Sequence, residues 1–185
     1  VMQSVTNYVE NKLKLSVNRL KSKSGPLVQS QFLGFQINRR GQVKWTAKAL
    51  TRFKQRIKEI TRRNRGHAVQ DVIDELRRYA VGWMNYFGIS HTSREVRELD
   101  DWTRRRVRLY YWKQWKRPRT RRRNLIKLGI NPSVVFKASR SRKGYWRMSQ
   151  NSLVCFALNN RYLKEQGVPE LREICIRLHY GDKPK

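Results

Sequence analysis

The stretch that decides the fold is residues 68–87, AVQDVIDELRRYAVGWMNYF. Its apolar residues recur every three or four positions, which places Val72, Leu76 and Trp83 on one side of a helix. Gly88 follows directly and predicts the end of that helix. Residues 68–87 therefore predict a long amphipathic helix around which other helices can pack.

Two further helices flank this one in the sequence. Thr46 can cap a helix with apolar residues at helical spacing, and Arg65-Gly66 predicts its end. Thr92-x-x-Glu95 is a capping box for a third helix, which runs toward Trp115. Three successive helices with short connections predict an up-and-down bundle.

The residues before and after the bundle predict shorter elements. Residues 2–15 have helical spacing, residues 31–37 and 43–45 predict two strands of a hairpin, and residues 38–41 predict its turn. After Pro118 we expect short helices at 119–128, from 132 and at 151–165, a basic loop at 139–144, and a last short element beyond 169. The predicted class is mainly α with a small β-hairpin, an α+β fold.

Positive charge dominates the composition. The 185 residues hold 43 Lys and Arg against 13 Asp and Glu, a net charge of +30, and no acid occurs at residues 11–58 or 102–164. Such an excess repels itself in a compact state and is typical of proteins that bind a polyanion. A membrane surface is the rival polyanion, but no apolar run approaches the ~20 residues of a spanning helix, and no signal peptide opens the chain. We expect a nucleic acid, above all structured RNA, as the partner.

Two segments carry the strongest signal for RNA. Residues 104–123 hold eleven Lys and Arg with four Tyr and Trp among them, and residues 139–147 combine cations, small residues and two rings. Cations hold phosphates and rings stack on unpaired bases. The alternative is that the rings belong to the core and the cations form a solvated face. The residues expected to contact RNA are Lys48, Arg52, Arg56, Arg63, Arg104, Arg105, Arg108, Trp112, Lys113, Trp115, Lys116, Arg117, Arg119, Arg121, Arg122, Arg123, Arg140, Arg142, Lys143, Tyr145, Trp146 and Arg147.

The acidic residues do not predict a catalytic site. Two-metal phosphoryl transfer needs carboxylates that converge on cations about 4 Å apart. Asp71 and its neighbours lie in the opening turns of a helix, where acids favour the positive end of the dipole. Asp100 and Asp101 are adjacent and point about 100° apart. No serine or cysteine is placed in the sequence to pair with His67, His91 or His179 as a nucleophile, and Cys155 and Cys175 lack metal-ligand spacing. We therefore expect no catalytic residue and no metal site.

Ordered motifs along the chain resemble one family. They are Val1-Met2-Gln-Ser-Val-Thr, Leu13-Lys-Leu-x-x-Asn18-x-x-Lys21-Ser22, Phe32-Leu33-Gly34-Phe35, Tyr79-x-x-Gly82-Trp83-x-x-Tyr86-Phe87, Trp112-x-x-Trp115-x-Arg117-Pro118 and Gly144-Tyr145-Trp146-Arg147. Together they are similar to the C-terminal part of group II intron reverse transcriptases, which are also maturases. The resemblance covers nearly the whole chain.

The resemblance implies a domain plan and roles for some residues. Residues 1–45 would be the C-terminal edge of a reverse-transcriptase palm, 46–117 a helical thumb, and 118–185 a basic maturase-specific extension. Asn18, Lys21 and Ser22 would belong to a palm motif. Phe32, Leu33, Gly34 and Phe35 would form a primer-grip-like motif whose glycine lets the backbone approach the primer terminus.

The family's catalytic Tyr-x-Asp-Asp motif does not occur in the chain. We expect it, with the Mg²⁺ that it binds, in a portion before Val1, so we expect neither polymerisation by this chain alone nor a cofactor held by it. The expected function is to clamp intron RNA, or a template–primer duplex, and so assist splicing and mobility.

Two alternatives remain open, a C-terminal subunit of a split RNA-directed DNA polymerase and a basic structural RNA-binding protein. The expected partners are group II intron RNA, an RNA/DNA template–primer and the missing reverse-transcriptase portion, without a membrane. The expected location is the bacterial cytoplasm.

Overall fold

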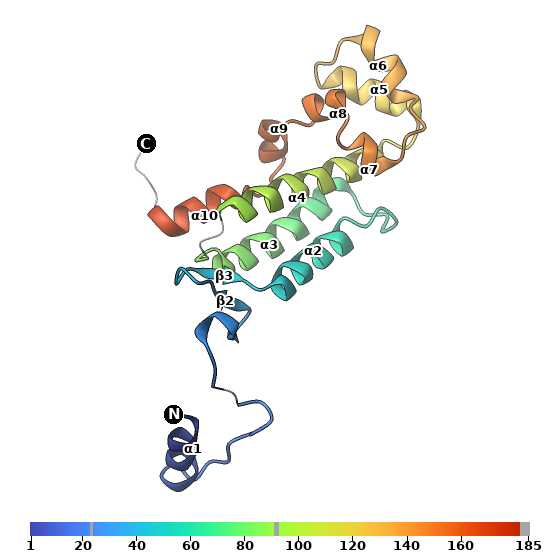
Figure 1. Cartoon of the computed structure of the whole chain (residues 1–185). Coiled ribbons are helices and arrows are strands. Elements are labelled where there is room, and N and C mark those ends of the chain that lie inside the picture. The colour runs from blue at the N-terminus through green and yellow to red at the C-terminus, as the bar shows by residue number, and fades with distance from the viewer. Residues whose placement is uncertain (23, 91–92, 182–185) are drawn as a thin grey trace.

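The computed structural model describes residues 1–22, 24–90 and 93–181 (Figure 1). Helices dominate, and the described strands form one three-stranded antiparallel sheet, so the predicted α+β class is confirmed. The helices at the C-terminal side gather along one long central helix, whereas the N-terminal helix lies apart from them (Figure 1).

The sheet has the order β1-β2-β3, with β1 at Gln31–Phe32, β2 at Phe35–Ile37 and β3 at Val43–Trp45. Phe32 pairs with Phe35, and Leu33 (φ 50°) and Gly34 (φ 86°) form the two-residue turn between them. Two positive φ values match a type I′ hairpin turn. The predicted single strand over 31–37 is therefore wrong, because a leucine rarely adopts this conformation and the sequence lacks the usual Asn-Gly signal.

Three helices build the bundle, α2 at Ala47–Ile60, α3 at Val69–Phe87 and α4 at Ser93–Gln114. The Thr46 cap is confirmed, since Ala49 N donates to Thr46 Oγ1 at 3.2 Å. The predicted end of α3 at Gly88 is also confirmed. Helix α2 ends at Ile60 and not at Gly66, and Arg65 donates to the Ile60 carbonyl oxygen at 3.1 Å. The capping box predicted at Thr92 lies outside the described residues.

Six short helices follow. They are α5 at Pro118–Lys127, α6 at Pro132–Ser139, α7 at Tyr145–Met148, α8 at Ser152–Ala157, α9 at Asn160–Glu165 and α10 at Leu171–Tyr180. The predicted single helix at 151–165 is two helices, because Asn159 caps a new one by accepting from Tyr162 N at 2.9 Å. Helices α5 to α8 gather at the C-terminal end of α4 (Figure 1).

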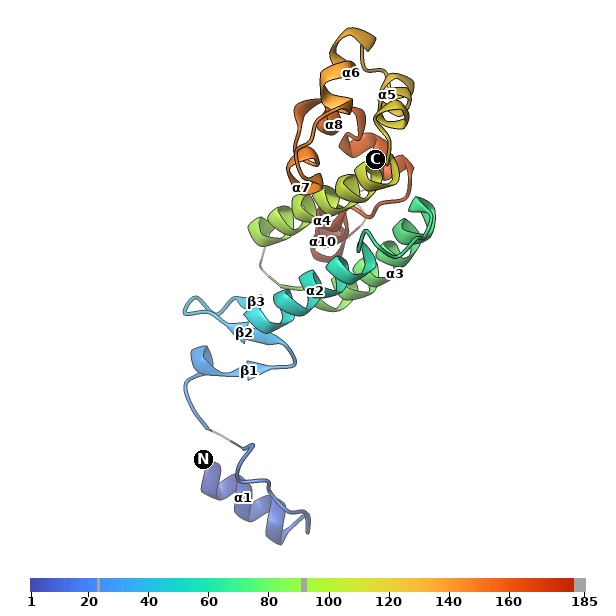
Figure 2. The same ribbon diagram turned by 90° about the vertical axis from the view of Figure 1, so that its right-hand side faces the viewer.

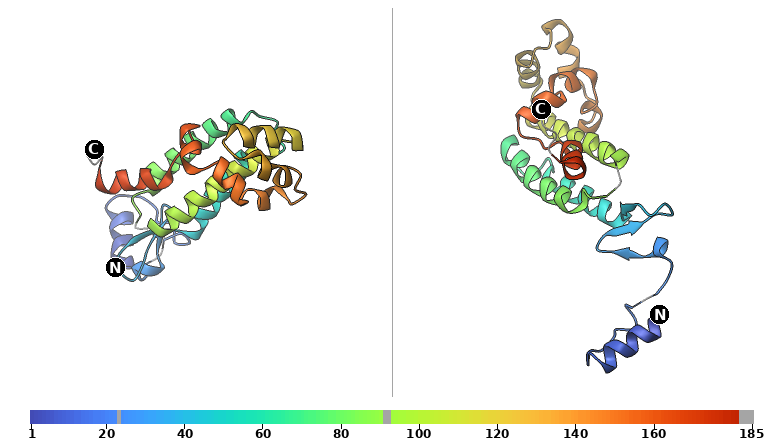
Figure 3. Two further views of the ribbon diagram at one scale, coloured as in Figure 1. Left: turned by 90° about the horizontal axis from the view of Figure 1, so that it is seen from above. Right: turned by 90° about the vertical axis from the view of Figure 1, so that its left-hand side faces the viewer.

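One apolar core joins these helices. Phe53 of α2, Leu76 of α3, Trp112 of α4 and Leu171 of α10 are fully buried in the same cluster. Helix α10 packs on both α3 and α4, which Figure 3 shows from two sides. The last helix thus shares the core of the bundle, while the domain boundary predicted at residues 117/118 stays a prediction.

The sheet is attached to the end of α3 through aromatic side chains. Trp45 Nε1 donates to the Phe87 carbonyl oxygen at 2.8 Å, and the rings of Phe35 and Phe87 lie 5.1 Å apart. A Cβ added to Gly34 would lie 3.0 Å from the Phe87 ring. This close approach gives Gly34 a structural reason to be glycine, independent of any primer.

Helix α1, at Met2–Asn11, lies away from the bundle and buries none of its residues (Figure 2). The helix predicted for residues 2–15 is confirmed as far as Asn11. A short 3₁₀ helix, η1 at Leu27–Gln29, precedes the sheet. Within the described residues, no helix combines the length and apolar character that crossing a bilayer requires.

Candidate nucleic-acid interface

Three half-buried arginines of α4 bind carbonyl oxygens at the ends of other helices. The last carbonyl groups of a helix lack intrahelical hydrogen-bond partners and carry partial negative charge. A cation at that end supplies the missing donor and also neutralises the charge. These arginines fasten α7, α2 and α8 to α4 in a segment without acids. The contacts are Arg105 to Trp146 O at 3.0 Å, Arg106 to Lys58 O and Thr61 O at 3.3 Å each, and Arg108 to Leu158 O at 2.9 Å.

Burial lowers the pKa of the Arg105, Arg106 and Arg108 guanidinium groups, and nearby Arg63 lowers the pKa of Arg106 further. All three stay protonated near neutral pH because an arginine does not lose its proton in proteins. The carbonyl contacts offset the cost of removing these charges from water. Arg105 and Arg108 were predicted to contact RNA, but the structure uses them to hold the fold.

Arg104 is also a structural residue, which corrects its predicted role in RNA binding. Its Nη2 lies 2.7 Å from Asp100 Oδ2 and 3.4 Å from Glu170 Oε1, and the side chain is buried. Asp100 Oδ1 in turn accepts from Leu171 N at 3.1 Å, at the start of α10. Burial raises the pKa of Asp100 to about 6, although Arg104 and the Leu171 N–H lower it. The pair fastens α10 to α4.

Trp112, Trp115 and Arg121 lie in the core, so their prediction as RNA contacts is corrected as well. Trp112 is fully buried and Trp115 is 9% exposed. Arg121 donates to Trp115 O at 3.0 Å, and its guanidinium lies 4.6 Å from the Trp112 ring centroid. Neither indole has an open face for a base. The three side chains form the joint at which α5 turns away from α4.

The remaining cations of this region are exposed on one part of the molecule. We name residues 113–147 the basic lobe, which comprises the end of α4, α5, α6, the loop at 140–144 and most of α7. In the part of the chain that the structure describes, no ion pair uses a cation from residues 105–160. The predicted residues that stay exposed in the lobe are Lys116, Arg117, Arg119, Arg122, Arg123, Arg140, Arg142, Lys143, Trp146 and Arg147.

Tyr145 holds cations from three segments together. Its half-buried ring lies 5.3 Å from Arg63, 5.5 Å from Lys113 and 6.0 Å from Arg121, measured from the ring centroid. The electron-rich face of a ring attracts cations and takes the place of an absent acid. The Tyr145 ring therefore holds Arg63, Lys113 and Arg121 close to one another, and Arg63 and Lys113 lie at the edge of the cationic surface.

The cations predicted on α2 fall into two groups. Lys48 and Arg52 are exposed, and neither has an acidic partner among the described residues. Arg56 instead lies 3.2 Å from both Glu59 and Glu75, which neutralises part of its charge. Arg56 is thus a weaker candidate for a phosphate contact than its exposure alone suggests.

Two concave sites in or beside the basic lobe include residues that sequence reasoning missed. One, of about 360 Å³, is lined by Lys58, Arg62, Arg63, Arg106, Leu109 and Trp146. The other, of about 570 Å³, lies between α5 and α6, where the Arg140 guanidinium is 4.1 Å from the Phe136 ring centroid. Lys58 lies in the last turn of α2 and Arg62 in the turn that follows it, so helical spacing alone does not bring them together. No local signal pointed to Phe136.

The palm-motif and primer-grip-like residues implied by the family resemblance lie outside this lobe. Asn18 Oδ1 accepts from Leu20 N and Lys21 N at 3.1 Å each, and the Leu33 carbonyl oxygen accepts from Tyr86 Oη at 3.1 Å. Asn18 of the palm motif and Leu33 of the primer-grip-like motif thus each have a hydrogen-bond partner within the chain. Their implied palm and primer-grip roles stay predictions.

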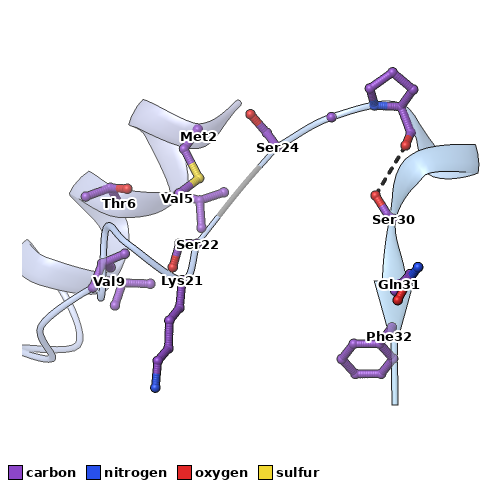
Figure 4. Close-up of a pocket in the computed structure, with 13 residues that line it drawn as sticks. Met2, Val5, Thr6, Val9, Lys21, Ser22, Ser24, Ser30, Gln31 and Phe32 are labelled. Atoms are coloured by element: carbon purple, nitrogen blue, oxygen red, sulfur yellow. Dashed lines mark hydrogen bonds between the residues drawn. The ribbon is translucent and has the colours of Figure 1, made fainter. Parts of the chain in front are cut away.

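A cavity of about 910 Å³ lies between α1 and β1. Figure 4 shows Met2, Val5 and Val9 of α1 on one side and Phe32 on the other, with Lys21 and Ser22 between them. Among the described residues, its lining is mainly apolar and hydroxyl-bearing, with Lys21 as the basic side chain. This cavity therefore differs in chemistry from the two concave sites of the basic region.

Two of the acids near the start of α3 have basic partners. Glu75 lies 2.8 Å from Arg65, and Asp74 lies 3.6 Å from Arg77. Within residues 1–22, 24–90 and 93–181, no three His, Cys, Asp or Glu side chains lie together in a way that could hold a metal ion. Both cysteines are free thiols, and burial raises the pKa of Cys175.

Comparison with known protein families finds a similarity that covers most of the bundle. Residues 50–129 match the family model described as group II intron, maturase-specific domain, and this segment runs from α2 through α5. No match was found among curated proteins. The matched segment includes the arginine-rich end of α4 and the exposed cations of α5. Residues 50–129 are therefore similar to the maturase-specific domain of group II intron proteins, the family whose C-terminal region the sequence motifs resemble.

Proposed function

We propose that this chain binds group II intron RNA through the basic lobe and clamps it, so that the intron can fold and splice. The maturase-specific domain at residues 50–129 supports a role in splicing. The observation that carries the RNA proposal is the layout of charge. Exposed cations crowd the lobe, and no described acid pairs with any of them.

The way in which the lobe is built supports the same function. Buried arginines at 104 and 121 and half-buried arginines at 105, 106 and 108 hold the helices together, while their neighbours at 119, 122 and 123 on α5 stay exposed. The exposed cations are thus carried by a backbone that is already ordered, so binding to phosphates costs the freedom of their side chains and not that of the helix. Each phosphate that they neutralise releases counterions from the RNA, which makes binding strong at low salt.

The salt dependence of binding tests the proposal. We expect the triple variant Arg119→Gln, Arg122→Gln, Arg123→Gln to flatten the slope of log K against log salt by roughly 2–3, because about 0.7–0.9 of a counterion is released per phosphate contact. The assay is filter binding or fluorescence anisotropy with the full chain and a group II intron RNA. A slope equal to that of the wild type would show that α5 does not contact phosphates.

A matched control separates this effect from total charge. Arg94 and Arg161 are exposed, lie outside the lobe and pair with Glu98 and Glu165 one helical turn away. We expect Arg94→Gln with Arg161→Gln to leave the slope unchanged. Competition with an unrelated structured RNA of the same length separates a maturase from a general RNA-binding protein, because only a maturase prefers the intron.

A further inference from the structure

Trp146 differs from the other tryptophans of the arginine-rich region because its ring is both fixed and accessible. It lies on α7, packed against α4 (Figure 1), and is 39% exposed. The Arg105 guanidinium lies over the ring, 3.5 Å from its centroid. The same arginine donates to Trp146 O at 3.0 Å and to Ser149 Oγ at 3.4 Å. Arg105 thus covers one face of the indole and holds the ring in place.

A cavity of about 360 Å³ lies beside this ring. Trp146 and Leu109 provide its apolar lining, and Arg105 is absent from the residues that line it. Trp146 thus contacts Arg105 through its ring and also contributes to the lining of this cavity. Its volume falls within the range of small-molecule sites, roughly 300–1,000 Å³.

The rest of the lining is cationic. Lys58, Arg62 and Arg63 come from α2 and the turn that follows it, and Arg106 comes from α4. Arg106 is already engaged, because it donates to carbonyl oxygens at the end of α2. Among the described residues, Lys58, Arg62 and Arg63 have no acidic partner. Lys58 and Arg62 are thus available to an anion beside a fixed ring, and Arg63, whose guanidinium lies 5.3 Å from the Tyr145 ring centroid, adds a third positive charge.

We propose that this cavity takes one unpaired nucleotide of the bound RNA, with its base stacked on Trp146 and its phosphate held by Lys58, Arg62 and Arg63. The proposal rests on the proposed function and adds to it a preference for RNA with an unstacked base. Bases inside an RNA duplex are stacked on each other and cannot reach the indole, whereas a bulged base is free to do so. Stacking on an aromatic ring is tolerant of sequence, so the site reads the presence of an unpaired base and not its identity.

The experiment uses the full chain and two RNA hairpins that differ only in one bulged 2-aminopurine, a base whose fluorescence falls when it stacks. We expect the wild type to bind the bulged hairpin more tightly than the fully paired one and to quench its fluorescence. Trp146→Ala should abolish the quenching and reduce the preference for the bulged hairpin by roughly 5- to 100-fold. Trp146→Phe, which keeps a ring, should retain the quenching, and Arg161→Gln, far from the cavity, should behave as the wild type.

A second variant keeps the test decisive if Trp146→Ala fails to fold, which its circular dichroism would reveal. Arg62 is exposed, so Arg62→Gln leaves the core untouched. We expect it to lower the salt slope of the bulged hairpin by about one and to affect the paired hairpin less. Equal losses on both hairpins, or binding without quenching, would overturn the nucleotide site while the proposed function stands. Failure of the wild type to bind either hairpin would overturn both.

Discussion

Replacing Arg108 by methionine tests whether the arginines of α4 serve the fold or the RNA. Arg108 Nε donates to Leu158 O at 2.9 Å and its Nη2 donates to Asn160 Oδ1 at 3.0 Å. These two contacts fasten the end of α8 and the start of α9 to α4. Methionine keeps most of the aliphatic stem but removes both donors, so the change isolates the hydrogen bonds from the packing.

We expect Arg108→Met to lower the free energy of unfolding by about 2 kcal/mol, because hydrogen bonds to a charged group contribute roughly 1.5–3 kcal/mol and the Leu158 carbonyl loses its partner. For a chain of this size, that corresponds to a fall in Tm of about 4–8 °C. Calorimetry or thermal circular dichroism measures the fall, with Arg94→Met as the control. Arg94 is 88% exposed and pairs only with Glu98, so its loss should cost less than about 0.5 kcal/mol.

The same variant has a second readout in RNA binding. If Arg108 serves the fold, the slope of log K against log salt stays that of the wild type at a temperature where the variant is folded. An unchanged Tm combined with a slope lower by about 0.9 would refute the reasoning, because Arg108 would then be a phosphate contact.

Two further predictions concern the pH dependence of stability and the hairpin turn. Burial raises the pKa of Asp100 to about 6, so the stability that its protonated form contributes is present below about pH 4 and is lost as the pH rises through 6. The free energy of unfolding of the wild type, relative to that of Asp100→Asn, should therefore fall by about 2 kcal/mol between pH 4 and pH 7 in urea unfolding. A difference that stays constant with pH would contradict this. Gly34→Ala should cost at least about 1–2 kcal/mol, since φ is 86° and the new Cβ would lie 3.0 Å from Phe87, whereas Gly41→Ala (φ 74°, nothing within 4 Å) carries the backbone strain alone. Equal losses of stability for the two glycine variants would show that the Phe87 contact is unimportant.

The bundle helices were predictable from the sequence because their signals are local. Apolar spacing identified α2 and α3, Thr46 identified the start of α2, and Gly88 identified the end of α3. The hairpin at Leu33 and Gly34 was missed because its turn depends on contacts with Tyr86 and Phe87 at the end of α3, more than fifty residues away. Local pattern therefore predicts an element well only where local interactions determine it.

Composition and residue order alone establish a strongly basic chain with two long acid-free stretches, whose motifs resemble those of maturases. Net charge and the order of residues are properties of the unfolded chain as well, so they can be read without knowing the structure. They predicted a polyanion as partner and residues 104–123 as a focus of positive charge. They could not separate Arg108 from Arg119, because both sit in the same basic run.

Only the tertiary structure decided which of these cations are buried and which are exposed. Burial depends on where α7, α8 and α10 dock on α4, and those contacts join residues 40 or more positions apart. The same docking buried Trp112, left Trp146 accessible and brought it beside Lys58 and Arg62 of a distant segment. Docking is set by the shape and hydrogen bonding of the whole core, which no local pattern of residues encodes.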